Sequence, residues 1–139
     1  MGRIMCAVFK IRHSVFRPGE VVPAIGECGI VSHPWAGFAR AEILDWWQRK
    51  GGTLLDIPAT EFAERSDHTR LLIWGEVPAG LILRALLEKK SGKPLIRIVT
   101  RASSKDEIGH YQHPRMPLLE EPLYEPAEIP LPEPQPELF

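Results

Sequence analysis

The stretch RLLIWGEVPAGLILRALLEKKSGKPLIRIVTR, residues 70–101, carries the clearest structural pattern in the chain. Two β-rich runs, RLLIWGEV and PLIRIVTR, flank the segment PAGLILRALLEKKSGK. This segment has Pro78 at its start and Gly92 near its end, residue types that favour the first turn and the C-terminus of a helix. Because its sixteen residues suffice for a crossover, the pattern predicts two parallel strands joined by a helix with a right-handed connection.

Shorter patterns on either side complete a predicted α/β fold with a small mixed sheet. A nearly continuous apolar run predicts a buried strand, and the Gly- and Pro-rich stretch after it predicts short strands and turns. An amphipathic segment that ends at Gly51 predicts the first helix. The elements expected outside 70–101 are a buried strand at 4–11, short strands within 16–35, a helix at 37–50, a strand at 53–57, a helical turn at 60–66 and a short helix at 103–112.

The tryptophan pair Trp46-Trp47 lies within the helix expected at 37–50. At helical spacing, two adjacent indoles on a broad apolar arc are typical of core packing. A platform for base stacking is the alternative. We therefore predict that the pair belongs to the core and keep the platform open.

Length and composition indicate one domain with a real core, since the chain has 139 residues and 44% hydrophobic content. No run approaches the roughly 18 apolar residues of a membrane span, and the first residues lack the pattern of a secretory signal. We therefore expect no membrane partner and a cytoplasmic location. Cys6 and Cys28 are too few for a disulfide scaffold or a four-cysteine zinc site, so they are predicted to be buried free thiols.

Charge and proline are divided unevenly along the chain. Residues 1–115 hold all 17 Lys and Arg but 12 of the 18 acids, a surplus of five positive charges. Residues 116–139 hold six Glu and no base, and eight of the 14 prolines lie in residues 114–136. This composition predicts one folded domain at 1–115 followed by an extended, solvated and disordered tail at 116–139.

Motifs for known catalytic chemistry are lacking. The sequence contains no glycine-rich phosphate loop, no GxSxG and no HExxH. His110 and His113 have the i, i+3 spacing of two ligands on one helix face, but no third ligand is visible nearby, so we expect solvated histidines. No cofactor and no metal is predicted, and the catalytic residues, if the chain is an enzyme, stay unknown.

The segment Gln135-Pro136-Glu137-Leu138-Phe139 places two large apolar side chains after an acidic, proline-rich stretch. The pattern Gln-x-x-Leu-Phe resembles the peptide by which bacterial polymerases and mismatch-repair proteins dock onto the sliding clamp. The resemblance implies that the Gln135 amide binds at the rim of one subsite while Leu138 and Phe139 enter an apolar pocket. An arm that packs on its own body or on a partner subunit, and a Pro-rich ligand for another groove, are the alternatives.

A second pattern, IRIVTRASSKDEIGHY at 96–111, resembles the last strand and helix of small ribonuclease toxins of the BrnT type. This resemblance implies that Arg97, Arg101, Glu107 and Tyr111 contact phosphates and bases. The positive surplus of the body adds Lys105 to Arg97 and Arg101 as possible DNA or RNA contacts.

These patterns together predict an accessory protein of DNA replication or repair, encoded by a bacterium, a phage or a mobile element. The protein would dock onto the sliding clamp through Gln135, Leu138 and Phe139 and would not itself be catalytic. A small ribonuclease or toxin-like nuclease that uses Arg97, Arg101 and Glu107 is the alternative, so enzymatic activity is left open.

Overall fold

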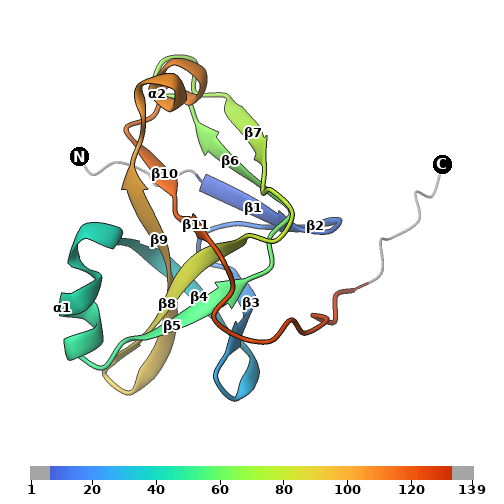
Figure 1. Ribbon diagram of the computed structural model, residues 1–139, viewed down its shortest axis with the longest axis vertical. Helices are drawn as coiled ribbons and strands as arrows, with labels where there is room; N and C mark the ends of the chain where they lie inside the picture. The colour runs from blue at the N-terminus through green and yellow to red at the C-terminus, as the bar shows by residue number, and fades with distance from the viewer. Residues whose placement is uncertain (1–6, 133–139) are drawn as a thin grey trace.

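The computed structural model describes residues 7–132 of this chain (Figure 1). Of the described residues, 52% lie in strands and 13% in helices. The protein is therefore mostly β with some α, and the predicted α/β class is wrong in its balance although its mixed sheet is confirmed. None of the helices within 7–132 has the length and apolarity needed to cross a bilayer.

A smaller antiparallel sheet begins the described chain. Its strands, in spatial order, are β2 (Ser14–Phe16), β1 (Ala7–Ile11), β6 (Glu61–Arg65) and β7 (Leu72–Glu76). The described part of the buried strand expected at 4–11 is confirmed by β1. The helical turn expected at 60–66 is wrong, because β6 there pairs with both β1 and β7.

A larger mixed sheet forms the rest of the body. Its strands, in spatial order, are β10 (Arg115–Pro117), β9 (Lys93–Ala102), β4 (Gly29–Arg40), β3 (Val21–Gly26), β5 (Thr53–Ile57), β8 (Ile82–Lys90) and β11 (Leu119–Glu120). Because β8 also pairs with β9, strands β9, β4, β3, β5 and β8 close into a ring within the described residues. β4 and β9 are parallel, and the other pairs described in this sheet are antiparallel.

The unit expected at 70–101 contains no helix and no parallel pair. The predicted helix is β8, which pairs antiparallel with both β5 and β9. Lys90 is paired with Lys93, so Ser91-Gly92 is a two-residue turn, and both have positive φ as this turn type requires. The run that begins at Ile82 is typical of a strand covered on both faces, since Ile82 to Leu86 are all buried.

The helix expected at 37–50 begins later than predicted. β4 continues to Arg40, a 3₁₀ turn η1 (Ala41–Ile43) follows, and α1 (Leu44–Arg49) ends before Gly51. Residues 37–40 are extended because they pair with β9. The short helix expected at 103–112 is confirmed by α2 (Lys105–Tyr111), whose first turn is fixed by a capping box between Ser104 and Glu107.

The core lies between the two sheets. Phe9 of β1 and Trp35 of β4 are buried, and their ring centroids are 5.3 Å apart. Leu83 and Ile96, from β8 and β9, belong to the same buried cluster. In Figure 1, α2 lies at the top beside β6 and β7, and α1 lies toward the lower end beside β9.

Residues 118–132, called the C-terminal strap below, run along the body. Ile129 is only 1% exposed, and its carbonyl accepts a hydrogen bond from the Arg12 side chain at 2.6 Å. His13 Nε2 is 2.9 Å from the carbonyl of Pro132. The boundary expected near 115 is crossed by the fold, because β10 and β11 pair with β9 and β8 and Ile129 is buried, while Leu123 and most of residues 125–132 are exposed as expected of a solvated segment. Gln135, Leu138 and Phe139 lie outside the described residues.

Candidate acid–base site

Glu64 is a buried carboxylic acid on β6. β6 places it in the register position opposite Ala7 of β1, and its side chain is 6% exposed. It lines a cavity of about 10 Å³, together with Phe9, Trp35 and Phe62 among others, which is close to the smallest space that holds one water molecule. Burial away from water raises the pKa of Glu64 to about 8.

His113 faces this carboxyl group. Its Nε2 lies 3.8 Å from Glu64 Oε2, and its side chain is 25% exposed. Its Nδ1 lies 2.7 Å from the Arg115 carbonyl oxygen, the shorter of its two backbone contacts. The backbone N–H of Arg115 also lies 3.1 Å from Nδ1, so the tautomer of the neutral ring decides whether Nε2 accepts or donates toward Glu64. The pair therefore brings a buried carboxyl group and a partly exposed imidazole to within 3.8 Å of each other.

Arg115 holds the chain after His113 in place. Its guanidinium forms two hydrogen bonds to the carboxylate of Glu42, at 2.6 and 2.9 Å, and a third to the Thr100 carbonyl at 2.8 Å. The same contact holds the pKa of Glu42 at about 2, mainly through the hydrogen bonds from Arg115. Arg115, two residues after His113, thus joins β10 to η1 and β9.

Tyr111 closes the site on the side of α2. Its ring centroid is 5.7 Å from that of Phe62, and it packs over Gly75, where a Cβ atom would collide with both rings. Burial raises the pKa of the Tyr111 hydroxyl, and the nearby charges of Glu107 and Glu64 act in the same direction. Gly75 is therefore needed for the close approach of α2 to β7.

The arrangement suits proton transfer. The raised pKa of Glu64 favours its protonated form near neutral pH, so its carboxyl can donate a proton. The 3.8 Å between Glu64 Oε2 and His113 Nε2 is longer than a hydrogen bond. Perturbed titratable groups that meet beside a cavity are typical of functional sites. No group of three or more His, Cys, Asp or Glu within the described ranges could hold a metal ion.

Of the residues expected to contact nucleic acid, Arg101 and Glu107 pair with each other, whereas Arg97 has a different partner. Arg97 donates to Glu88 at 2.7 Å, whereas Arg101 forms two hydrogen bonds to Glu107 at 2.7 and 2.6 Å. Lys105 is exposed in the first turn of α2. The Glu107 carboxylate is therefore engaged by Arg101. The hydrogen bonds from Arg101 are the main reason that the pKa of Glu107 is lowered to about 2.

The predictions of solvated histidines and buried cysteines are wrong for His113 and for Cys28. His113 is partly buried and hydrogen-bonded, whereas His110 is exposed as expected. Cys28 is exposed in the turn between β3 and β4, so it is not a buried thiol. Cys6 lies outside the described residues, directly before Ala7 in the chain.

Sequence reasoning missed Glu64 because residues 60–66 were read as a helical turn. As a strand, EFAER places Phe62 and Glu64 on one face, since side chains two residues apart share a side. An acid on the same face as a core phenylalanine is the signal that could have identified it.

No known protein family, curated protein or solved structure matches this chain.

Proposed function

We propose that this chain is an accessory protein of DNA replication or repair that docks onto the bacterial sliding clamp through Gln135, Leu138 and Phe139. The observation that carries the proposal is the pattern Gln-x-x-Leu-Phe after an acidic, proline-rich stretch. Burial of one Leu and one Phe supplies about 3 to 6 kcal/mol, and one hydrogen bond adds about 1 kcal/mol. Since ordering the peptide offsets part of this gain, micromolar affinity is expected.

The strap supports this proposal by fixing the point from which the peptide extends. Ile129 is buried and the Pro132 carbonyl contacts His13, so seven residues separate the last described contact from Phe139. At about 3.3 to 3.6 Å per residue, this length reaches at most roughly 25 Å. A docked clamp would therefore be held close to the body rather than at the end of a long tether.

Titration of a labelled peptide of residues 128–139 against purified clamp tests the proposal, with saturation expected at micromolar clamp. In full-length protein, Leu138→Ala with Phe139→Ala should abolish retention on immobilised clamp. Glu137→Ala is the matched control, because the residue between the glutamine and the apolar pair is variable in the pattern. Absence of saturation up to several hundred micromolar would exclude clamp docking.

A second candidate function is acid–base catalysis at Glu64 and His113, which the raised pKa of Glu64 and the 3.8 Å separation favour. Protein near DNA would meet nucleic acid as the first available substrate, so we propose incubation with labelled DNA and RNA strands. Loss of a strand-modifying activity in Glu64→Gln and His113→Gln, but not in Arg101→Ala, would support this site. Loss in Arg101→Ala alone would instead support the ribonuclease alternative.

A further inference from the structure

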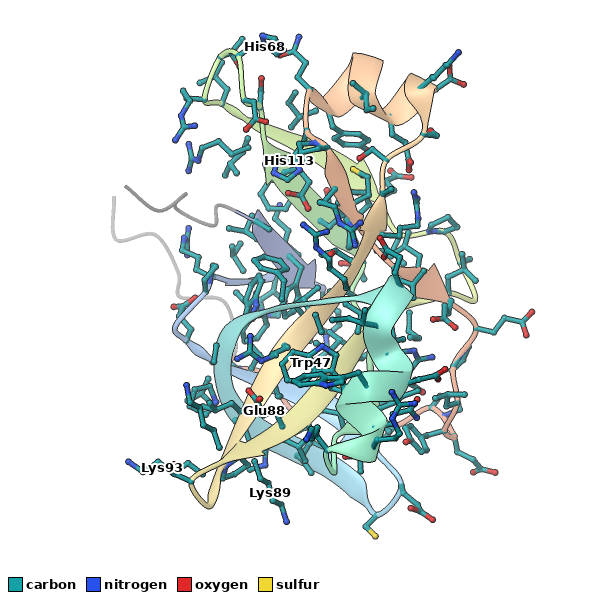
Figure 2. The ribbon with its side chains drawn as sticks, turned by 90° about the vertical axis from the view of Figure 1, so that its left-hand side faces the viewer. Trp47, His68, Glu88, Lys89, Lys93 and His113 are labelled. Atoms are coloured by element: carbon teal, nitrogen blue, oxygen red, sulfur yellow. The ribbon has the colours of Figure 1, made fainter. Side chains whose placement is uncertain are left out.

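A groove lies between α1 and the hairpin of β8 and β9, away from the acid–base site. It has a volume of about 370 Å³, within the range of small-molecule sites. Its lining includes Trp46, Trp47, Lys50, Lys89, Lys90 and Arg97. We call it the hairpin groove. Figure 2 shows Lys89 and Lys93 near the tip of the hairpin, below Trp47 and Glu88, whereas His113 lies toward the other end of the molecule.

The charge of the hairpin groove is positive and largely uncompensated. Within residues 7–132, Lys50, Lys89 and Lys90 form no ion pair. Glu88 also lines the groove, but its carboxylate accepts from Arg97 Nε at 2.7 Å, so this acid does not neutralise the lysines. The groove therefore favours an anionic ligand.

The aromatic side of the groove offers a stacking surface. The two indole rings meet edge to face with centroids 5.0 Å apart, and the Arg97 guanidinium lies 4.9 Å from the Trp47 centroid. Trp47 packs on the cluster around Leu86, whereas Trp46 is 44% exposed. Lys50 Nζ lies 5.9 Å from the Trp46 centroid, which places a cation beside an exposed ring. The predicted core packing is therefore confirmed for Trp47 and wrong for Trp46, whose ring is exposed.

We propose that the hairpin groove binds single-stranded DNA. A positively charged groove next to exposed aromatic rings is the arrangement by which proteins hold single strands, with phosphates on the cations and bases stacked on the rings. Duplex bases already stack on one another and cannot stack on Trp46, so a single strand fits better. The choice of DNA over RNA rests on the proposed role at the clamp, but the groove uses none of the residues of the clamp peptide.

Fluorescence anisotropy of a labelled 15-nucleotide dT strand with full-length protein tests this inference. We expect saturable binding at about 50 mM salt and an affinity that falls steeply with added salt. Trp46→Ala should weaken binding roughly 5- to 100-fold, and Trp46→Phe should restore most of the loss. Lys89→Gln with Lys90→Gln should also reduce the slope of log affinity against log salt by about 1.4.

Arg17→Gln is the matched control, because Arg17 is an exposed cation that does not line the groove. It should lower affinity only slightly. No saturation at low salt, an equal loss in Arg17→Gln, or tighter binding of the matching RNA or duplex would each overturn the inference. Since the clamp titration uses a separate peptide, the two proposals can fail independently.

Discussion

Glu64 carries a carboxyl group whose ionisation opposes folding near neutral pH. The pKa is about 8 in the folded protein and near 4.5 in an unfolded chain, because the folded group is removed from water. Between these pH values the folded state keeps a proton that the unfolded state has lost. The free energy of unfolding should therefore fall as pH rises from about 4.5 to 8.

Glu64→Gln removes this dependence and should stabilise the protein most at pH 8. Each unit of pKa difference corresponds to about 1.4 kcal/mol, so a gain of several kcal/mol is expected. Urea unfolding of both proteins at pH 5 and pH 8 measures it. Glu107→Gln is the control, because the pKa of Glu107 is lowered to about 2, so its stabilising contribution is the same at pH 5 and pH 8 and its removal should cost the same at both. Equal slopes for Glu64→Gln and the parent would contradict the assignment.

Gly75 lies so close to Phe62 and Tyr111 that no larger side chain fits there. A Cβ atom there would lie 2.9 Å from Phe62 Cζ and would also collide with the Tyr111 hydroxyl. Gly75→Ala should lower the free energy of unfolding by about 1 to 3 kcal/mol, because the rings must shift. Gly109→Ala in α2 has open space around it and should be neutral or stabilising by up to about 1 kcal/mol. Thermal melts of both variants provide the comparison.

At the scale of elements, β8 shows where sequence reasoning succeeds and fails. The runs ending at Glu76 and beginning near Lys93 were predicted as strands because β-branched and aromatic residues alternate there with turn signals. β8 was predicted as a helix because Pro78 precedes it and Gly92 follows it, residue types that are typical of helix ends. Gly92 instead belongs to the two-residue turn to β9, a local hairpin signal that was misread, whereas the other partner, β5, is distant in sequence and no local pattern reveals it.

The same limit applies to the candidate site. His113 was noticed for its spacing from His110, yet its observed partner is Glu64 on a different element. The ion pair of Arg101 and Glu107 was near in sequence and both residues were named in advance. Tertiary register, which no local pattern encodes, decides which titratable groups meet.

The contact between β5, β8 and the strap leads to a prediction at this scale. Asp56 and Arg84 are both 1% exposed and joined at 2.6 Å, and Asp56 also accepts the backbone N–H groups of Leu123 and Tyr124 at about 3.0 Å. Asp56→Ala leaves the buried Arg84 charge with only the longer ion pair to Glu120, at 3.6 Å, and should cost about 3 to 5 kcal/mol.

Urea unfolding measures this loss, and limited proteolysis should cleave the strap faster in Asp56→Ala. Asp56→Leu with Arg84→Met removes both charges and should cost much less. A double variant as unstable as Asp56→Ala would mean that the buried charge is not the cause.

For the whole molecule, the strap determines where the folded body ends. Ile129 is 1% exposed, whereas Leu123 in the same strap is 56% exposed. Ile129→Ala should lower the free energy of unfolding by about 2 to 5 kcal/mol, since it opens a cavity in the core. Leu123→Ala should have little effect. Chemical denaturation measures both variants. If Ile129→Ala changed the free energy of unfolding as little as Leu123→Ala, the strap would not unfold cooperatively with the body.

The contact of Arg12 with Ile129 also bears on how the protein is made. The two residues are 117 positions apart, and at about 5 to 20 residues per second a ribosome needs roughly 6 to 23 s to add the second after the first. During that interval the apolar surface that later receives Ile129 has no cover. Nascent chains of this protein should therefore bind ribosome-associated chaperones until the strap has been synthesised.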